Sequence, residues 1–240
     1  MIDGYKLIDI TDFLSDDEIN TYLHHVKNFS VDLDNIESSL GFLCMGSNII
    51  KALLIEDQSR YHRMKEKDKI NYDDFKFLKH LNEKHDLPLE EYFNFFLHIA
   101  NSEYNRSVLF NLIKKAYVKF LESTFDKILK PEYFDEMLGG INVYPKGSFI
   151  KKHVDTGANS ERLLTTLFFL NCDRKKEDGS ILKIYTKDEI IEIIPDCMKF
   201  IVLEHQNFNY VHEVTKNESD NVRYTVYCPF TIDDLNTKMI

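Results

Sequence analysis

The chain has 240 residues, of which 43% are hydrophobic and 29% charged, and its formal net charge is −10. This length allows one large domain or two small ones, and the composition is that of a globular protein with a substantial core. The hydrophobic segments are interrupted too often to span a bilayer, and the negative charge disfavours general nucleic-acid binding. We therefore expect no membrane role.

The N-terminus and the cysteines indicate a reducing, cytoplasmic location. The first six residues lack a basic start followed by an apolar stretch, so no secretory signal is expected. Cys44, Cys172, Cys197 and Cys228 are scattered and form no Cys-x-x-Cys pair. This spacing argues against a disulfide framework and a thiolate zinc site, and it predicts small core residues.

The N-terminal half is predicted to be mainly helical. A strand over residues 5–13 runs into Ser15-Asp16-Asp17-Glu18, a capping-box sequence that predicts the start of a helix. The pattern then stays largely helical over residues 73–135. Apolar residues at helical spacing are expected to pack against the core: Ile19, Tyr22, Leu23, Val26, Phe75, Leu78, Leu81, Tyr92, Phe93, Phe96, Leu109, Leu112, Ile113, Ala116 and Phe120.

The histidines of this half show neither His-x-Asp nor His-x-x-x-His spacing. We therefore interpret them as surface or helix-packing residues. They are His24, His25, His62, His80, His85 and His98.

The sequence pattern changes after Pro131, where short β-rich runs begin. Turn-forming segments such as Lys176-Glu177-Asp178-Gly179 separate these runs. About eight runs at this spacing indicate a β-sandwich or a jelly-roll barrel. The runs are 141–144, 149–155, 163–170, 180–185, 190–194, 198–203, 209–214 and 222–228.

The two halves are expected to share one core, which makes residues 1–240 a single α+β domain. Residues 1–136 would be mainly helical support and an insertion, and residues 137–231 would form the β core. The role of the charged helical segment 55–138 is left open.

Two side chains in one strand predict a metal site. In a strand alternate residues share a face, so His153 and Asp155 project together. A third histidine would complete one face of an octahedral metal and leave the other positions open. We expect His212 in that role, and His205 is the competitor.

A cationic anchor accompanies this site. Arg223 follows His212 by eleven positions, and Thr225 lies on the same strand face. An arginine binds a carboxylate in two-pronged geometry, and a hydroxyl can donate to the same oxygen pair. A zinc hydrolase with the same three ligands would leave Arg223 and Thr225 unexplained.

Residues 139–230 resemble the iron(II)- and 2-oxoglutarate-dependent oxygenases, and among them the prolyl 4-hydroxylase-like branch. The order and spacing of the motifs match as well as their residues. The motifs are Tyr144-Pro-Lys-Gly147, His153-Val-Asp155, Arg162-Leu-Leu-Thr165, Gly179-Ser-Ile-Leu, Ile194-Pro195 and His212-Glu-Val214 before Arg223.

The resemblance implies a double-stranded β-helix core that binds Fe(II) through His153, Asp155 and His212. 2-Oxoglutarate would chelate the iron while Arg223 pairs with its distal carboxylate. The other cosubstrate is O2, ascorbate is an optional addition, and the co-products are succinate and CO2. Thr225, Tyr144 and Asn142 are secondary candidates for cosubstrate contact. The expected reaction is hydroxylation of an amino-acid-type substrate, either free or within a peptide or protein.

Two departures from the branch concern the substrate. Phe169 stands where protein-prolyl relatives often have tyrosine, and Ser180 replaces the second glycine of a common pair. Both weaken assignment to protein prolines. Asp155 argues against halogenation, because halogenating members of the family lack this carboxylate.

Other residues and other functions were weighed beside this interpretation. Arg162 is expected to make a surface ion pair or a loop contact, and Thr165 to face inward. The alternative function is a noncatalytic jelly-roll binding or scaffold protein with a residual metal site. The identity of the substrate, the position hydroxylated and the oligomeric state stay open.

Overall fold

The structure, a computed structural model, describes residues 4–35, 37–39, 47–67, 69–87, 94–100, 104, 106–155, 161–205 and 210–240. The helices are α1 (Asp16–Lys27), α2 (Ser47–Glu56), α3 (Gln58–Lys67), α4 (Tyr72–Lys84), α5 (Val108–Phe125) and α6 (Ile232–Lys238). The strands are β1 (Tyr5–Asp9), β2 (Glu37–Ser39), β3 (Lys69–Asn71), β4 (Asn94–Phe95), β5 (Leu97–Ala100), β6 (Gly140–Tyr144), β7 (Phe149–His153), β8 (Arg162–Phe169), β9 (Leu182–Tyr185), β10 (Ile190–Ile193), β11 (Lys199–Glu204), β12 (Val211–Val214) and β13 (Arg223–Thr231).

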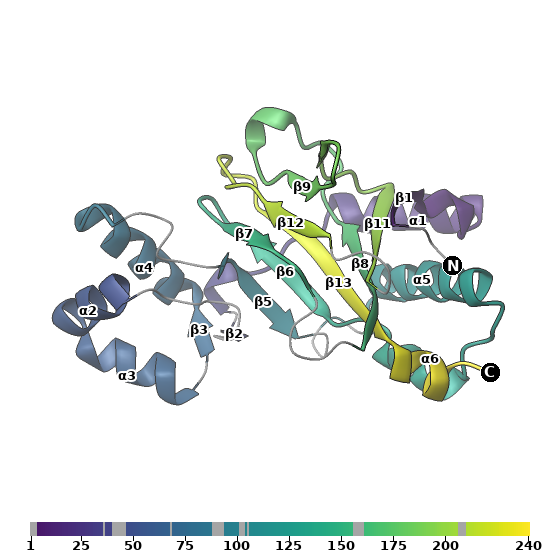
Figure 1. Ribbon diagram of the computed structural model, residues 1–240, viewed down its shortest axis with the longest axis horizontal. Coiled ribbons are helices and arrows are strands. Elements are labelled where there is room, and N and C mark those ends of the chain that lie inside the picture. Colours follow the sequence, from purple (N-terminus) through teal and green to yellow (C-terminus); the bar gives the residue numbers. More distant parts are fainter. Residues whose placement is uncertain are drawn as a thin grey trace.

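Two antiparallel sheets form the β core (Figure 1). The six-stranded sheet has the order β1-β11-β8-β13-β6-β5, and the five-stranded sheet has the order β10-β9-β12-β7-β4. From β6 onward the chain passes back and forth between the two sheets, and only β9 and β10 follow each other within one sheet. This is the strand arrangement of a double-stranded β-helix, so the predicted α+β jelly-roll fold is confirmed.

Strand β8 contributes side chains to two separate hydrophobic layers, one on each face of its sheet. Phe168 packs on Phe200 of β11, with ring centroids 4.5 Å apart, and on Tyr117 of α5 at 6.0 Å. Its neighbours Leu167 and Phe169 belong to a separate core cluster between the two sheets. Since alternate residues of a strand point to opposite faces, the six-stranded sheet is apolar on both faces. Helix α5 covers one face, and the five-stranded sheet covers the other.

Helix α1 begins where the capping sequence predicts. The Ser15 amide donates to the Glu18 carboxylate at 3.0 Å, and Glu18 also pairs with Lys115 of α5. On its buried side the Tyr22 hydroxyl donates to the carbonyl of Cys197 at 2.6 Å. These contacts fix α1 against α5 and against the segment that precedes β11.

Helices α2, α3 and α4 lie beside the β core with the two-stranded sheet of β2 and β3, at the left of Figure 1. Asp74 is fully buried there and accepts hydrogen bonds from Arg60, at 2.8 Å, and from Arg63. Within the described residues, no helix combines the length and the apolarity that a membrane crossing requires. The expected single domain over residues 1–240 and the role of segment 55–138 stay predictions.

The prediction of a largely helical segment over residues 73–135 is wrong around Phe96. Phe96 lies between β4, which pairs with β7, and β5, which pairs with β6. The chain therefore crosses here from one sheet to the other. The edges of both sheets offer backbone hydrogen bonds, and aromatic and branched residues fit a pleated surface. Tyr92 and Phe93, predicted in the same helix, lie outside the described residues, whereas the packing expected of α4 and α5 is observed.

The prediction of unpaired core cysteines is wrong for one pair. Cys172 and Cys197 form a disulfide with their Cα atoms 4.6 Å apart. Strands β8 and β11 are antiparallel neighbours, so the end of one strand meets the start of the other. Short-range spacing could not reveal this pairing because it depends on sheet order. Cys228 is buried and free, and Cys44 lies outside the described residues.

Candidate metal centre

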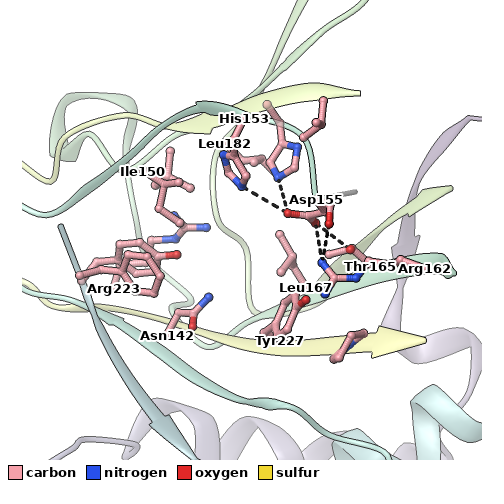
Figure 2. A pocket seen from close by; sticks show the side chains of 16 residues that line it. Asn142, Ile150, His153, Asp155, Arg162, Thr165, Leu167, Leu182, Arg223 and Tyr227 are labelled. Atoms are coloured by element: carbon pink, nitrogen blue, oxygen red, sulfur yellow. Dashed lines mark hydrogen bonds and ion pairs between the residues drawn. The ribbon is translucent and has the colours of Figure 1, made fainter. Parts of the chain in front are cut away.

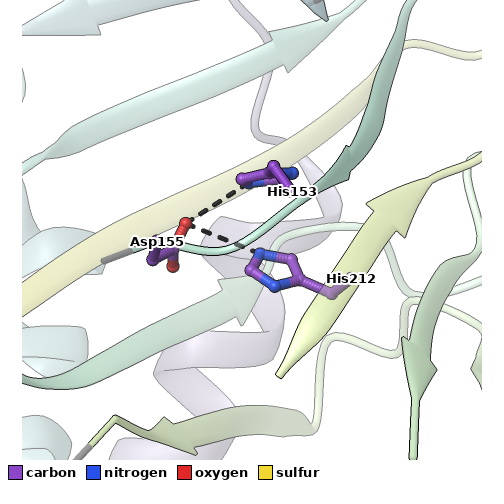
Figure 3. Close-up of side chains that lie close together, drawn as sticks. All are labelled: His153, Asp155 and His212. Carbon is purple, nitrogen blue, oxygen red and sulfur yellow. Dashed lines mark ion pairs between the residues drawn. The ribbon is translucent and has the colours of Figure 1, made fainter. Parts of the chain in front are cut away.

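The structure brings His153, Asp155 and His212 together. His153 ends β7 and lies directly opposite His212 of β12 in the strand ladder. The Nε2 atoms of His153 and His212 are 3.3 Å and 3.6 Å from Oδ1 of Asp155 (Figure 3). One ligand atom from each residue lies within 4.8 Å of the others. Strand β7 ends at His153, so Asp155 lies in the bend that follows the strand, and the three predicted residues form a possible metal site.

Backbone contacts orient both imidazole rings. The Nδ1 atom of His153 lies 2.8 Å from the carbonyl of Lys151, and Nδ1 of His212 lies 3.1 Å from the carbonyl of Tyr210. A carbonyl only accepts, so each Nδ1 carries the proton and donates it. Each Nε2 then points to Asp155 and offers a lone pair to a metal when it carries no proton. Two imidazole nitrogens and one carboxylate oxygen are the donor set of non-haem Fe(II) oxygenases.

The protonation states of Asp155 and His212 favour metal binding. Burial alone would raise the pKa of Asp155, but His153, His212 and Thr165 hold that pKa well below its usual range. Burial lowers the pKa of His212. For His153, burial opposes the charged form, yet Asp155 outweighs it and raises the pKa. An ionised carboxylate faces both imidazole rings. It would attract a metal cation bound at the ring nitrogens as it attracts a proton there.

Thr165 and His205 form a chain of hydrogen bonds that ends at the Asp155 carboxylate. The Thr165 hydroxyl donates to Oδ2 of Asp155 at 2.7 Å, which confirms that Thr165 faces inward. Nε2 of buried His205 lies 2.9 Å from the same hydroxyl oxygen, which accepts from it. Burial lowers the pKa of His205 to about 4, so the ring is neutral. His205, the competing candidate for the third ligand, lies beside the group of His153, Asp155 and His212 and is not part of it.

Arg162 also contacts Asp155. Its guanidinium donates to the Asp155 carbonyl at 3.1 Å and lies 3.9 Å from Oδ2. The expected loop contact is therefore present. Arg162 additionally lines the cavity described next, which the sequence did not indicate.

A cavity of about 390 Å³ lies between the two sheets (Figure 2). His153, Asp155 and His212 form one wall of it, and Arg223 lies on the far side together with Asn142. Apolar side chains separate these polar ends: Phe96, Ile150, Leu167, Leu182 and Val214. The cavity is thus a largely apolar chamber with charged groups at two places.

Arg223 is a buried cation without a counterion in the described part of the chain. Its side chain is fully buried, and none of its three guanidinium nitrogens has a hydrogen-bond partner there. The guanidinium lies over the rings of Tyr144 and Phe169, at 4.6 Å and 5.7 Å from their centroids. Burial lowers the pKa of Arg223 to about 10, so it is charged at neutral pH. A buried unpaired charge is costly, and an anionic ligand would relieve that cost.

The other predicted cosubstrate residues surround Arg223. Tyr144 and Asn142 lie opposite Arg223 and Thr225 in the ladder between β6 and β13, and both line the cavity. The Thr225 hydroxyl is buried and has no partner among the described atoms. Burial raises the pKa of Tyr144 to about 12, so its hydroxyl keeps its proton. A metal donor set and a buried cation in one cavity fit a small dicarboxylate that also binds the metal.

Two residues near this end were not predicted from the sequence as part of a site. Phe96 stacks on Tyr144 with ring centroids 5.2 Å apart. His98, interpreted as a surface or helix-packing residue, lies in β5 and contacts Asn142. The alternating residues Leu97, His98 and Ile99 were the only sequence signal for this strand.

Ser180 adopts a left-handed φ of 53°, the conformation that favours the glycine found in relatives.

Comparisons with known protein families and solved structures gave several matches. The sequence model of the 2OG-Fe(II) oxygenase superfamily matches residues 139–230. No curated protein matches the chain. Similar solved structures include the viral collagen prolyl hydroxylase of Paramecium bursaria Chlorella virus-1 in complex with 2OG. It is 14% identical, with a TM-score of 0.43, over 95% of this chain and 94% of that one.

Two further structures are similarly distant. A Trichoplax adhaerens prolyl hydroxylase, bound to a hypoxia inducible factor peptide fragment, is 14% identical with a TM-score of 0.41, over 96% of this chain and 84% of that one. A Pseudomonas putida prolyl 4-hydroxylase is 18% identical with a TM-score of 0.35, and the match covers 48% of this chain and 65% of that one. These likenesses assign no substrate to this chain. The match to the 2OG-Fe(II) oxygenase superfamily model over residues 139–230 covers the same segment as the resemblance found in the sequence.

Proposed function

We propose that the chain is an Fe(II)- and 2-oxoglutarate-dependent dioxygenase that hydroxylates a C–H bond of an amino-acid-type substrate, free or within a peptide or protein. Succinate and CO2 are the co-products. One observation carries the proposal: a His-Asp-His group and a buried, unpaired Arg223 face each other across one cavity. A dicarboxylate with a metal-chelating end satisfies both.

The protein contributes binding and orientation, and bound iron supplies the activation of O2 and the oxidation of the C–H bond. His153, Asp155 and His212 would hold the metal on one face and leave its other positions open. Arg223 would bind the distal carboxylate of 2-oxoglutarate through two parallel hydrogen bonds. Thr225, Tyr144 and Asn142 are candidates for further contacts. The apolar walls exclude water, which strengthens these charged contacts.

Fewer observations support the class of substrate than support 2-oxoglutarate as the cosubstrate. Phe169 brings a bare ring to 5.7 Å from the Arg223 guanidinium carbon, so the tyrosine hydroxyl common in protein-prolyl relatives is absent at this position. Arg162 adds a second cation close to the metal ligands. An amino-acid-type substrate with a polar backbone or a carboxylate suits such a site. Cytoplasmic location and a benefit from ascorbate stay predictions.

The test is turnover of 2-oxoglutarate by the full chain loaded with Fe(II) under air, with ascorbate and panels of amino acids and peptides. Succinate should form in step with a hydroxylated product, which gains the mass of one oxygen atom. The matched control is His212→Ala, which should abolish both products. A wild-type protein that binds Fe(II) and 2-oxoglutarate but forms no succinate with any substrate class would count against the proposal.

A further inference from the structure

A histidine outside the cavity contacts one of the residues that line it. His98 of β5 lies directly opposite Asn142 of β6 in the strand ladder. Directly opposite residues share a sheet face, and Nδ1 of His98 lies 2.7 Å from Oδ1 of Asn142. His98 itself does not line the cavity. Its influence on a ligand must therefore pass through Asn142.

The backbone of β6 is shaped to admit the His98 ring. Gly140 has a φ of 146°, which is accessible to glycine and rare for other residues. A Cβ atom at this position would lie 2.7 Å from Cε1 and 2.8 Å from Nε2 of His98. A side chain at residue 140 would therefore collide with the His98 ring and also with the carbonyl oxygen of Ile99, 2.5 Å from the same Cβ position.

The hydrogen bond has a defined direction. The amide oxygen of Asn142 only accepts, so Nδ1 of His98 must carry the proton. With its oxygen held by His98, Asn142 turns its NH2 group to the cavity, where Figure 2 shows it on the same side as Arg223.

We propose that His98 is a positioning residue for the cosubstrate: it fixes Asn142 so that the Asn142 amide acts as a hydrogen-bond donor beside Arg223. Arg223, whose guanidinium lies 4.6 Å from the Tyr144 ring centroid, supplies the charge. These neighbouring donors suit a carboxylate, which only accepts. The inference rests on the proposed function, since it assigns this carboxylate to 2-oxoglutarate. Strand β5 of the N-terminal half thereby contributes to a site whose ligands come from the C-terminal half.

The test is calorimetric titration of 2-oxoglutarate into the Mn(II)-loaded full chain without oxygen. His98→Phe keeps an aromatic ring but removes the donor, so Kd should rise about threefold to tenfold, as for one neutral hydrogen bond. His98→Asn places an N–H close to the position of Nδ1 and should restore most of the affinity. His85→Phe removes a histidine that pairs with Glu56 in the helical segment, and it should leave Kd unchanged. Mn(II) affinity and thermal midpoint are measured for every variant.

The outcomes separate this inference from the proposed function. Equal Kd values for wild type and His98→Phe, or equal losses in His98→Phe and His98→Asn, overturn the positioning role. If wild type does not bind 2-oxoglutarate, the proposed function fails. The direction of the hydrogen bond between His98 and Asn142 can then still be determined by 15N NMR of the histidine rings. That spectrum should show His98 as the Nδ1–H tautomer, with its signal shifted in Asn142→Leu. An Nε2–H tautomer overturns the inference by itself.

Discussion

Replacing Arg223 by methionine should make the ligand-free protein more stable while removing its affinity for 2-oxoglutarate. The pKa of the fully buried Arg223 is lowered from 12.5 to about 10. Because the folded pKa lies below the unfolded one, the charge destabilises the fold at every pH under about 10, by about 3 kcal/mol. Contact with the Tyr144 and Phe169 rings offsets about 1 kcal/mol of this. Arg223→Met should thus gain about 2 kcal/mol, or roughly 4–8 °C in thermal midpoint.

The same variant should lose ligand binding. Truncating one partner of a buried charge pair costs about 2–5 kcal/mol, which weakens binding at least roughly 30-fold. Scanning calorimetry with and without Mn(II) and 2-oxoglutarate measures both effects. Wild type should gain about 2.7 kcal/mol at 100 times its Kd, and Arg223→Met should gain nothing comparable from 2-oxoglutarate.

Arg174→Met is the matched control for this pair of effects. Arg174 is also partly enclosed, but it donates to the carbonyls of Asn221 and Asp178 and to the side chain of Asn217. Its replacement should therefore destabilise the protein and leave the affinity for 2-oxoglutarate intact. A ligand-free Arg223→Met protein that is less stable than wild type, or that binds 2-oxoglutarate equally well, would refute the reasoning.

Three further predictions follow from the contacts of the site and the disulfide. Asp155→Ala should weaken Mn(II) binding by more than about 100-fold in calorimetry, because it removes a direct ligand; a smaller loss would place the metal elsewhere. Thr165→Val should weaken it about 10- to 100-fold by removing the donor to Asp155, with Thr165→Ser as the retaining control. Cys172→Ala combined with Cys197→Ala should lower the free energy of unfolding in urea by about 3 kcal/mol, as expected for a closed loop of 25 residues; equal midpoints with and without reductant would contradict a stabilising disulfide.

The parts of the fold that depend on local pattern could be predicted from the sequence. The eight β-rich runs after Pro131 correspond to β6 through β13, although residue 209 at the start of one run lies outside the described part. Alternation along a strand predicted that His153 and Asp155 project together. In the structure β7 ends at His153, yet Asp155 still lies 3.3 Å from it, and the predicted His212 lies directly opposite His153. Local periodicity and the ligand spacing were sufficient here because each depends on a few neighbouring residues.

The parts that depend on distant neighbours could not be predicted. His98 and Phe96 belong to a short segment whose strand character comes from pairing with the free edges of both sheets. The disulfide depends on the adjacency of β8 and β11, which the spacing of Cys172 and Cys197 does not encode. The support of Asp155 by His205 likewise arises only when two loops meet over Thr165.

The central claim is that one cavity binds a metal at His153, Asp155 and His212 and a dicarboxylate that reaches Arg223. Its most direct test is an anaerobic titration of 2-oxoglutarate into wild-type protein with and without Fe(II), followed by calorimetry. We predict binding that requires the metal, and its loss when Arg223 is replaced by methionine. Binding of equal strength without metal, or no binding to a demonstrably iron-loaded protein, would contradict the account.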